Sequence, residues 1–187
     1  MLSSQYLFIP IILQMLVVGF DEVYFHNRRE ISRPEQLGHA LDTLTVLVCF
    51  ILALLVPPSP GVVLVFVLLS CFSCLFIAKD EINHHESCEA GERWSHAMAF
   101  TLHPLVFISV GLLWPALHLS GATGATGATG NSVQTFHFIH YVEDERLFIS
   151  VIAALLALFG LYELLPREMV WRNIAKRLKR REVAFDL

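Results

Sequence analysis

Long apolar runs separated by short polar segments dominate this chain. Five runs approach the roughly 20 residues that an α-helix, rising about 1.5 Å per residue, needs to cross a hydrocarbon core of about 30 Å. The expected spans are Tyr6 to about Phe25, about Leu37 to Val56, Gly61 to about Lys79, about Trp94 to Leu117, and about Leu147 to Leu165. The pattern predicts an all-α, polytopic integral membrane protein with about five transmembrane helices, of which the first four form a bundle.

Composition supports the membrane class and divides the chain. Hydrophobic residues make up 55% of the 187 positions, and the mean hydropathy is +0.59, which is too apolar for a soluble domain of this length. We expect a five-span domain over 1–166. Within it, 118–146 should form a flexible outer loop, because it contains Gly-Ala-Thr three times in a row. Residues 167–187 should form a basic amphipathic tail on the membrane lipids, and no nucleic-acid partner is expected.

The basic residues orient the predicted spans, because cytoplasmic loops retain Lys and Arg. All of the 13 Lys and Arg residues except Arg146 fall in the loops after the first and third spans or in the C-terminal tail. This distribution predicts an inner or plasma membrane protein with its N-terminus outside and its C-terminus in the cytoplasm. The inner ends of spans one to four then meet at one depth, near the cytoplasmic face.

These four inner ends each carry a carboxylate and a histidine at a spacing that places them on one helix face. Residues three or four apart are neighbours on a helix surface. The candidate metal ligands are Glu22 with His26, His39 with Asp42, Glu81 with His84 or His85, and Glu92 with His96. Some of them, together with the adjacent Asp21, could instead orient the ligands through hydrogen bonds.

Physical chemistry favours a metal as the partner of these groups. A lone carboxylate close to the hydrocarbon costs several kcal/mol, and a helical core ringed by mixed Glu and His is how carboxylate-bridged dimetal sites are built. Mixed nitrogen and oxygen donors suit iron, zinc or manganese. Because the candidates outnumber the ligands of one tetrahedral ion, the sequence predicts two metal ions, with iron as the first expectation.

The alternative for the same residues is an interfacial role. In that interpretation they stop the spans at the lipid headgroups and pair with basic side chains such as Arg28, Lys79 and Arg93. It explains the acids better than the histidines, because histidine has no special role as a stop signal.

Two further ionisable residues lie close to these helix ends. His103, followed by Pro104, is expected to be a buried, hydrogen-bonded histidine at a proline kink, with haem ligation beside His39 or His96 as the alternative. Glu163 is expected to mark the membrane interface, with membership of the site as the alternative.

Three function classes follow from a metal at these helix ends. The first is an oxidoreductase in which two irons activate dioxygen toward a lipid or other apolar substrate, with electrons from a redox partner. Its chemistry is similar to that of membrane diiron oxygenases and desaturases, although those carry repeated His-x-x-His boxes and this chain has only the His84-His85 pair. The second is a metal-dependent hydrolase, with zinc as the metal. The third is a non-catalytic metal- or haem-binding membrane subunit. The pattern predicts no individual catalytic residue.

Overall fold

The computed structural model describes residues 2–26, 33–84, 90–118, 139–140 and 144–164. Its helices are α1 (Phe8–Phe20), α2 (Arg33–Leu55), α3 (Pro60–His84), α4 (Ala90–Leu117) and α5 (Glu145–Leu164). A 3₁₀ turn, η1 (Ser4–Leu7), precedes α1, and a π-helical segment, η2 (Asp21–His26), continues it. Among the described residues, five helices are long and apolar enough to cross a membrane, in agreement with the predicted all-helical, five-span architecture.

The helices extend beyond the apolar runs at the end where the ionisable residues lie. α2 begins at Arg33 rather than near Leu37, α4 begins at Ala90, and α3 ends at His84. At the other end, α3 begins at Pro60, a residue suited to the first turn of a helix because it has no N–H to leave unsatisfied. The polar residues that flank the apolar runs are therefore held on helices.

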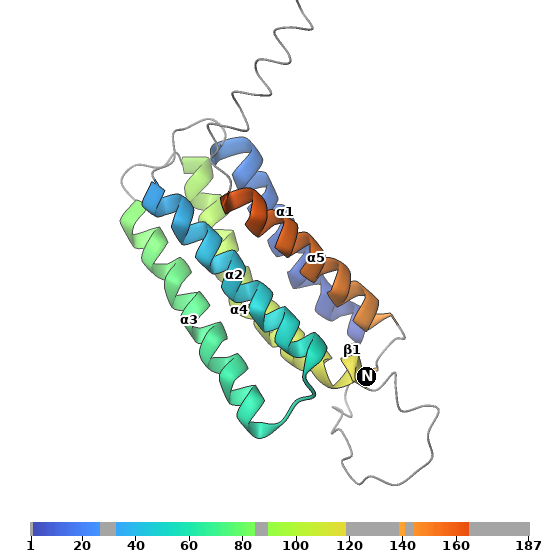
Figure 1. The fold of residues 1–187 in the computed structure, drawn as a ribbon. Helices are drawn as coiled ribbons and strands as arrows, with labels where there is room; N and C mark the ends of the chain where they lie inside the picture. Colours follow the sequence, from blue (N-terminus) through green and yellow to red (C-terminus); the bar gives the residue numbers. More distant parts are fainter. Residues whose placement is uncertain (1, 27–32, 85–89, 119–138, 141–143, 165–187) are drawn as a thin grey trace, which may run out of the picture.

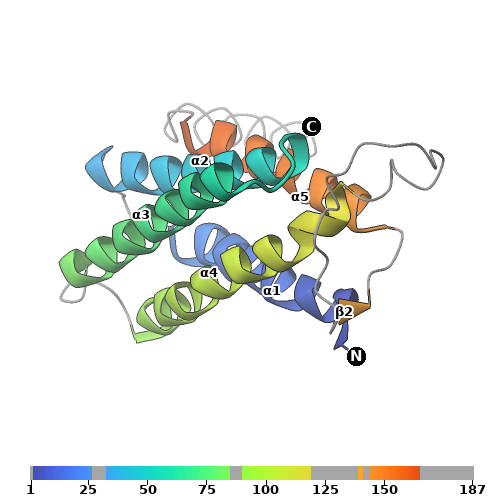
Figure 2. The same cartoon turned by 90° about the horizontal axis from the view of Figure 1, so that it is seen from below.

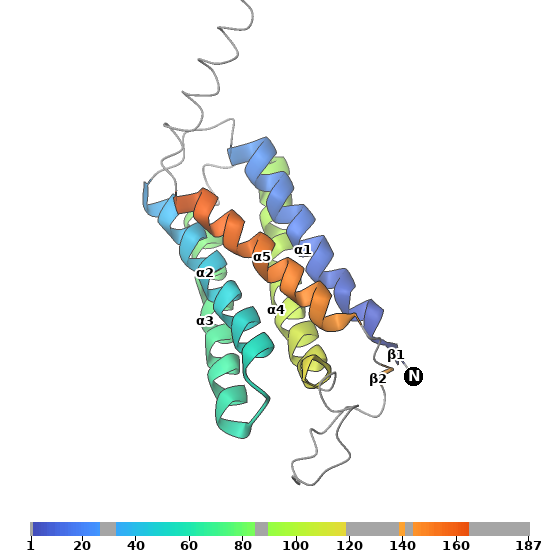
Figure 3. The ribbon, with the colours of Figure 1, turned by 45° about the vertical axis from the view of Figure 1, so that its right-hand side comes forward.

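Helix α2 occupies the middle of the molecule. It packs against α3, α4 and α5, and α1 packs against α4 (Figures 1 and 3). Figure 2 shows α1 and α4 side by side on one face of the layer formed by α2, α3 and α5. The predicted grouping of the first four spans therefore omits a neighbour, since α5 contacts both α2 and α4. Gly160 of α5 lies beside Thr43 of α2, where an added Cβ would be 3.4 Å from Thr43 Cγ2, an ordinary contact distance.

The apolar core fills the half of the molecule near the N-terminus. Phe50, Leu113 and Trp114 are at most 2% exposed there. Trp114 Nε1 donates a hydrogen bond of 2.8 Å to the Val56 carbonyl, and His118 Nε2 lies 2.9 Å from the Ala53 carbonyl. The last carbonyls of a helix lack intrahelical partners, so these two side chains satisfy the end of α2 and tie it to α4.

A two-residue parallel pairing joins the N-terminal residues to the segment before α5 at this end of the molecule. β1 (Leu2–Ser3) pairs with β2 (Ile139–His140), and Ser4 Oγ donates to Glu145 Oε1 at 2.8 Å. Ile139 is 4% exposed and belongs to the core, so this part of the predicted outer loop is packed. Most of that loop and the predicted tail over 167–187 lie outside the described residues.

The Trp114 hydrogen bond provides a test of the helix packing. Trp114→Phe keeps an aromatic ring in the core and leaves the Val56 carbonyl without its donor, which costs about 1–3 kcal/mol. We expect a lower midpoint of thermal unfolding in detergent. Trp94→Phe is the matched control, because Trp94 is 73% exposed. Equal midpoints for the two variants would contradict this packing.

Candidate functional site

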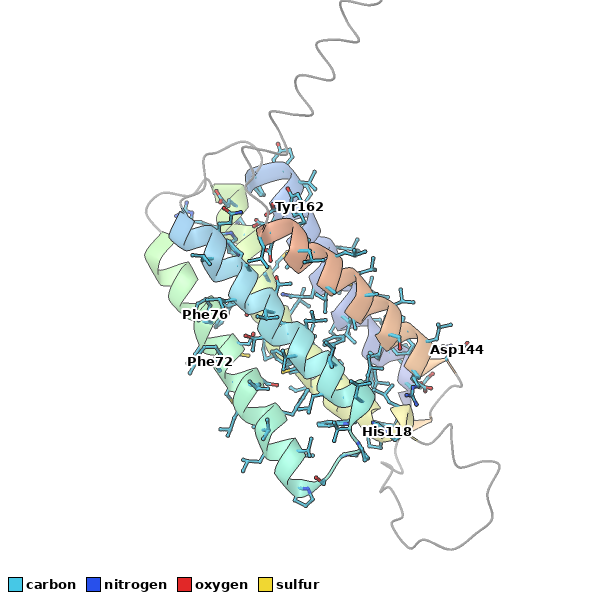
Figure 4. All side chains as sticks on the ribbon, viewed as in Figure 1. Phe72, Phe76, His118, Asp144 and Tyr162 are labelled. Carbon is cyan, nitrogen blue, oxygen red and sulfur yellow. The ribbon has the colours of Figure 1, made fainter. Side chains whose placement is uncertain are left out.

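A cavity of about 90 Å³ lies at the end of the molecule where α1, α3 and α5 finish and α2 and α4 begin. Figure 4 shows Phe76, which lines it, and Tyr162 toward this end, and His118 and Asp144 toward the opposite end. The polar lining residues are Gln14, Asp21, Glu22, His39, Asp42, Thr43, His96 and Glu163. The apolar walls include Val18, Phe76, Ile77, Ala99 and Phe159. The predicted convergence of helix ends therefore occurs, and it includes the end of α5.

Helix α1 and its π-helical continuation supply one wall. Gln14, Val18 and Asp21 follow one another at helical spacing and all line the cavity. Asp21 and Glu22, only 7% and 6% exposed, begin the π-helical segment. Such segments are rare and frequently occur at functional sites. The pairing of Glu22 with His26 stays a prediction, because the His26 side chain lies outside the described ones.

Helix α4 faces Asp21 across the cavity. His96 Nε2 lies 3.3 Å from Asp21 Oδ2, so this histidine meets a carboxylate from another helix. Glu92, its predicted partner on α4, is 2% exposed but is not among the lining residues. Glu92 sits in the first turn of α4, where the helix dipole favours a negative charge. The contact between α1 and α4 therefore brings together groups that spacing along one helix does not reveal.

Helices α2 and α5 complete the lining. His39 and Asp42, three residues apart, both line the cavity, as their shared face predicted. Glu163 is 3% exposed and also lines the cavity, so it lies beside the other ionisable residues. Gln36 Nε2 donates to the Glu163 carbonyl at 2.6 Å and fixes the end of α5 against α2.

A buried polar network extends inward from the cavity between α1, α2, α3 and α4. Ser73 Oγ donates to Asp42 Oδ1 at 2.5 Å and lies 2.8 Å from His103 Nε2. Gln14 Nε2 lies 3.5 Å from His103 Nδ1. His103, 3% exposed, is thus the buried, hydrogen-bonded histidine that the sequence predicted. Gln14 and Ser73 were missed, because single polar residues within apolar runs have no partner at a diagnostic spacing.

The residue types in this network resemble a Ser-His-Asp triad, but their order differs. In that triad the imidazole lies between the hydroxyl and the carboxylate, with a different ring nitrogen facing each. Here the hydroxyl of Ser73 lies between Asp42 and His103, and Asp42 Oδ1 is 3.6 Å from the same Nε2 that faces Ser73. The arrangement orients the carboxylate rather than activating a serine nucleophile.

The candidate metal ligands divide into three groups, one of which is Glu92 alone, buried but outside the cavity lining. Glu22, His39, Asp42 and His96 line the cavity, whereas the side chains of His26, Glu81 and His84, and all of His85, lie outside what the structure describes. Within the described residues no three His, Cys, Asp or Glu side chains are arranged to hold a metal ion. The cavity thus provides donors of suitable chemistry without a complete ligand set from the described side chains.

No model of a known protein family matches the chain, and no curated protein or solved structure is similar to it.

A double-mutant cycle tests the contact between Asp21 and His96. Groups in direct contact show coupling energies of about 0.5–3 kcal/mol, so the effects of Asp21→Asn and His96→Gln on the free energy of unfolding should be non-additive. The control cycle combines Asp21→Asn with His118→Gln, at the other end of the molecule, and should be additive. If the first cycle is additive too, the two side chains are not in contact in the folded protein.

Proposed function

We propose that this chain is an integral membrane metalloprotein that binds cations in the cavity between the helix ends. One observation carries the proposal. Carboxylates or histidines from four helices line a single cavity within a protein whose helices are long and apolar enough to cross a membrane. They are Asp21 and Glu22 of η2, His39 and Asp42 of α2, His96 of α4 and Glu163 of α5.

The energetics of burial support a cation in this position. Asp21, Glu22 and Glu163 are each 7% exposed or less, and a buried carboxylate is costly unless charge and hydrogen bonds compensate for it. Helical dimetal proteins place Glu and His side chains from several helices in a common interior for the same reason. A cavity of about 90 Å³ exceeds the space that one water molecule requires, so it has room for metal ions.

The proposed centre holds two ions, with iron the first candidate and zinc or manganese the others. Carboxylate oxygens and imidazole nitrogens form the donor set, and neither a cysteine nor a methionine lines the cavity among the described residues. His26, Glu81, His84 and His85 are the further donors in this proposal, because the described side chains do not form a complete set. Metals of this kind activate bound dioxygen or water.

The apolar walls favour a lipid-like substrate. Phe76, Ile77 and Phe159 line the same cavity as the carboxylates, so an apolar molecule from the bilayer could contact both. We propose oxidation, hydroxylation or desaturation of such a substrate. Reduction of dioxygen at two irons consumes electrons from outside the chain, so the proposal includes a redox partner. The alternatives are a metal-dependent hydrolase and a non-catalytic metal-binding subunit. The identity of the bound metal distinguishes them from the oxidoreductase.

The proposed orientation follows from charge. All Lys and Arg residues except Arg146 lie between Arg28 and Arg33, at Lys79 near the end of α3, at Arg93 near the start of α4, or in the C-terminal tail. The positive-inside rule then places the cavity near the cytoplasmic face and the N-terminus outside.

Elemental analysis of protein purified in detergent tests the metal proposal. We expect two irons per chain, and Glu22→Ala and His39→Ala should each lower the occupancy at least several-fold, because each removes a donor from the cavity lining. Zinc in place of iron would favour the hydrolase.

His118→Ala is the matched control for the histidine variant, because His118 contacts the Ala53 carbonyl at the opposite end of the molecule. It should retain full occupancy. A wild-type protein without bound metal, or full occupancy in both cavity variants, would overturn the proposal.

A further inference from the structure

A hydrogen-bonded chain of four side chains begins and ends at the cavity. Gln14 and Asp42 line the cavity, while Ser73 and His103, 0% and 3% exposed, connect them beneath it. The links are Gln14 Nε2 to His103 Nδ1 at 3.5 Å, His103 Nε2 to Ser73 Oγ at 2.8 Å, and Ser73 Oγ to Asp42 Oδ1 at 2.5 Å. Each link joins residues of different helices, so the chain fixes its end groups relative to each other.

The direction of donation in this chain follows from the number of protons available. An ionised carboxylate only accepts, so the single hydroxyl proton of Ser73 goes to Asp42. Ser73 Oγ must then accept from His103, which requires the proton of the neutral imidazole to be on Nε2. His103 Nδ1 is left as an acceptor and takes the amide N–H of Gln14. The opposite direction requires a protonated Asp42 that donates to Ser73.

The direction of donation determines which atoms Gln14 and Asp42, the two ends of the hydrogen-bonded series, present to the cavity. With its amide nitrogen turned to His103, Gln14 has its carbonyl oxygen, Oε1, left over as an acceptor. That atom is buried and has no hydrogen-bond partner among the described residues. Asp42 accepts from Ser73 through Oδ1, which holds this carboxylate in the cavity lining.

We propose that Ser73 and His103 are positioning residues that hold Gln14 Oε1 and Asp42 as oxygen ligands for a hard or borderline cation in the cavity. Gln14 thereby joins the binding site, although a lone glutamine in an apolar run gives no such signal. Carbonyl and carboxylate oxygens together suit iron or manganese better than a thiolate-binding metal. The identity of the cation rests on the proposed function. The direction of donation along these hydrogen bonds does not.

Nitrogen NMR of ¹⁵N-histidine-labelled protein in detergent tests the direction. The His103 resonances, assigned as those missing in His103→Asn, should show a neutral ring protonated on Nε2. Ser73→Ala should shift the Nε2 resonance, because it removes the acceptor. Gln14→Leu should shift the Nδ1 resonance, because it removes the donor.

Ser70→Ala is the matched control for Ser73→Ala. Ser70 lies on the same helix, is also buried, and donates to the Phe66 carbonyl of its own helix at 2.8 Å. It should leave the His103 resonances in place. A His103 ring protonated on Nδ1, or an Nε2 resonance that Ser73→Ala leaves unchanged, would overturn the proposed direction.

Metal affinity, measured by competition with a chelator, tests the consequence for the cavity. Gln14→Leu and Ser73→Ala should each weaken binding by about 10–100-fold, as loss of partners that orient metal ligands does elsewhere, while Ser70→Ala should bind as wild type does. Unchanged affinity in Gln14→Leu would overturn its role as a ligand. A wild-type protein that binds no metal would reject the proposed function, and the NMR result would still decide the direction of the chain.

Discussion

The cost of burying carboxylates among apolar helices is the constraint on which the cavity end of this molecule depends. Asp21, Glu22 and Glu163 lie in the interior of a protein that presents leucine, valine and phenylalanine on much of its outer surface. Each of them needs compensation by opposite charge or hydrogen-bond donors. Histidines and other polar side chains gather around the same cavity, and the proposed cation would add opposite charge there.

The two ends of the molecule meet their polar requirements in different ways. At the end near the N-terminus, Trp114 and His118 satisfy carbonyls at the end of α2, and the surrounding residues form the apolar core. At the other end, the π-helical segment that begins at Asp21 and the packing of α5 against α2 at Gly160 surround a polar cavity. The first arrangement gives stability to the fold, and the second leaves space that a ligand can occupy.

Hydrophobic periodicity and length were sufficient to predict the five helices, because each apolar run is long enough to cross a membrane. Positions three residues apart on one regular helix, such as His39 and Asp42, were also predictable. Contacts between side chains of different helices could not be predicted from the sequence. The approach of His96 to Asp21 depends on the packing of α4 against α1, and a pattern read along one helix contains no information about it. Ser73 lies beside Asp42 for the same kind of reason, since α3 must first pack against α2.

The central claim is that the ionisable residues around this cavity bind metal together. X-ray diffraction from crystals of the purified protein, collected on both sides of the iron and zinc absorption edges, tests it most directly. The account predicts anomalous difference peaks inside the cavity, within ligand distance of Glu22, His39 and His96. Anomalous peaks located only elsewhere, or a cavity filled by water and hydrogen bonds alone in protein purified without chelators, would contradict it.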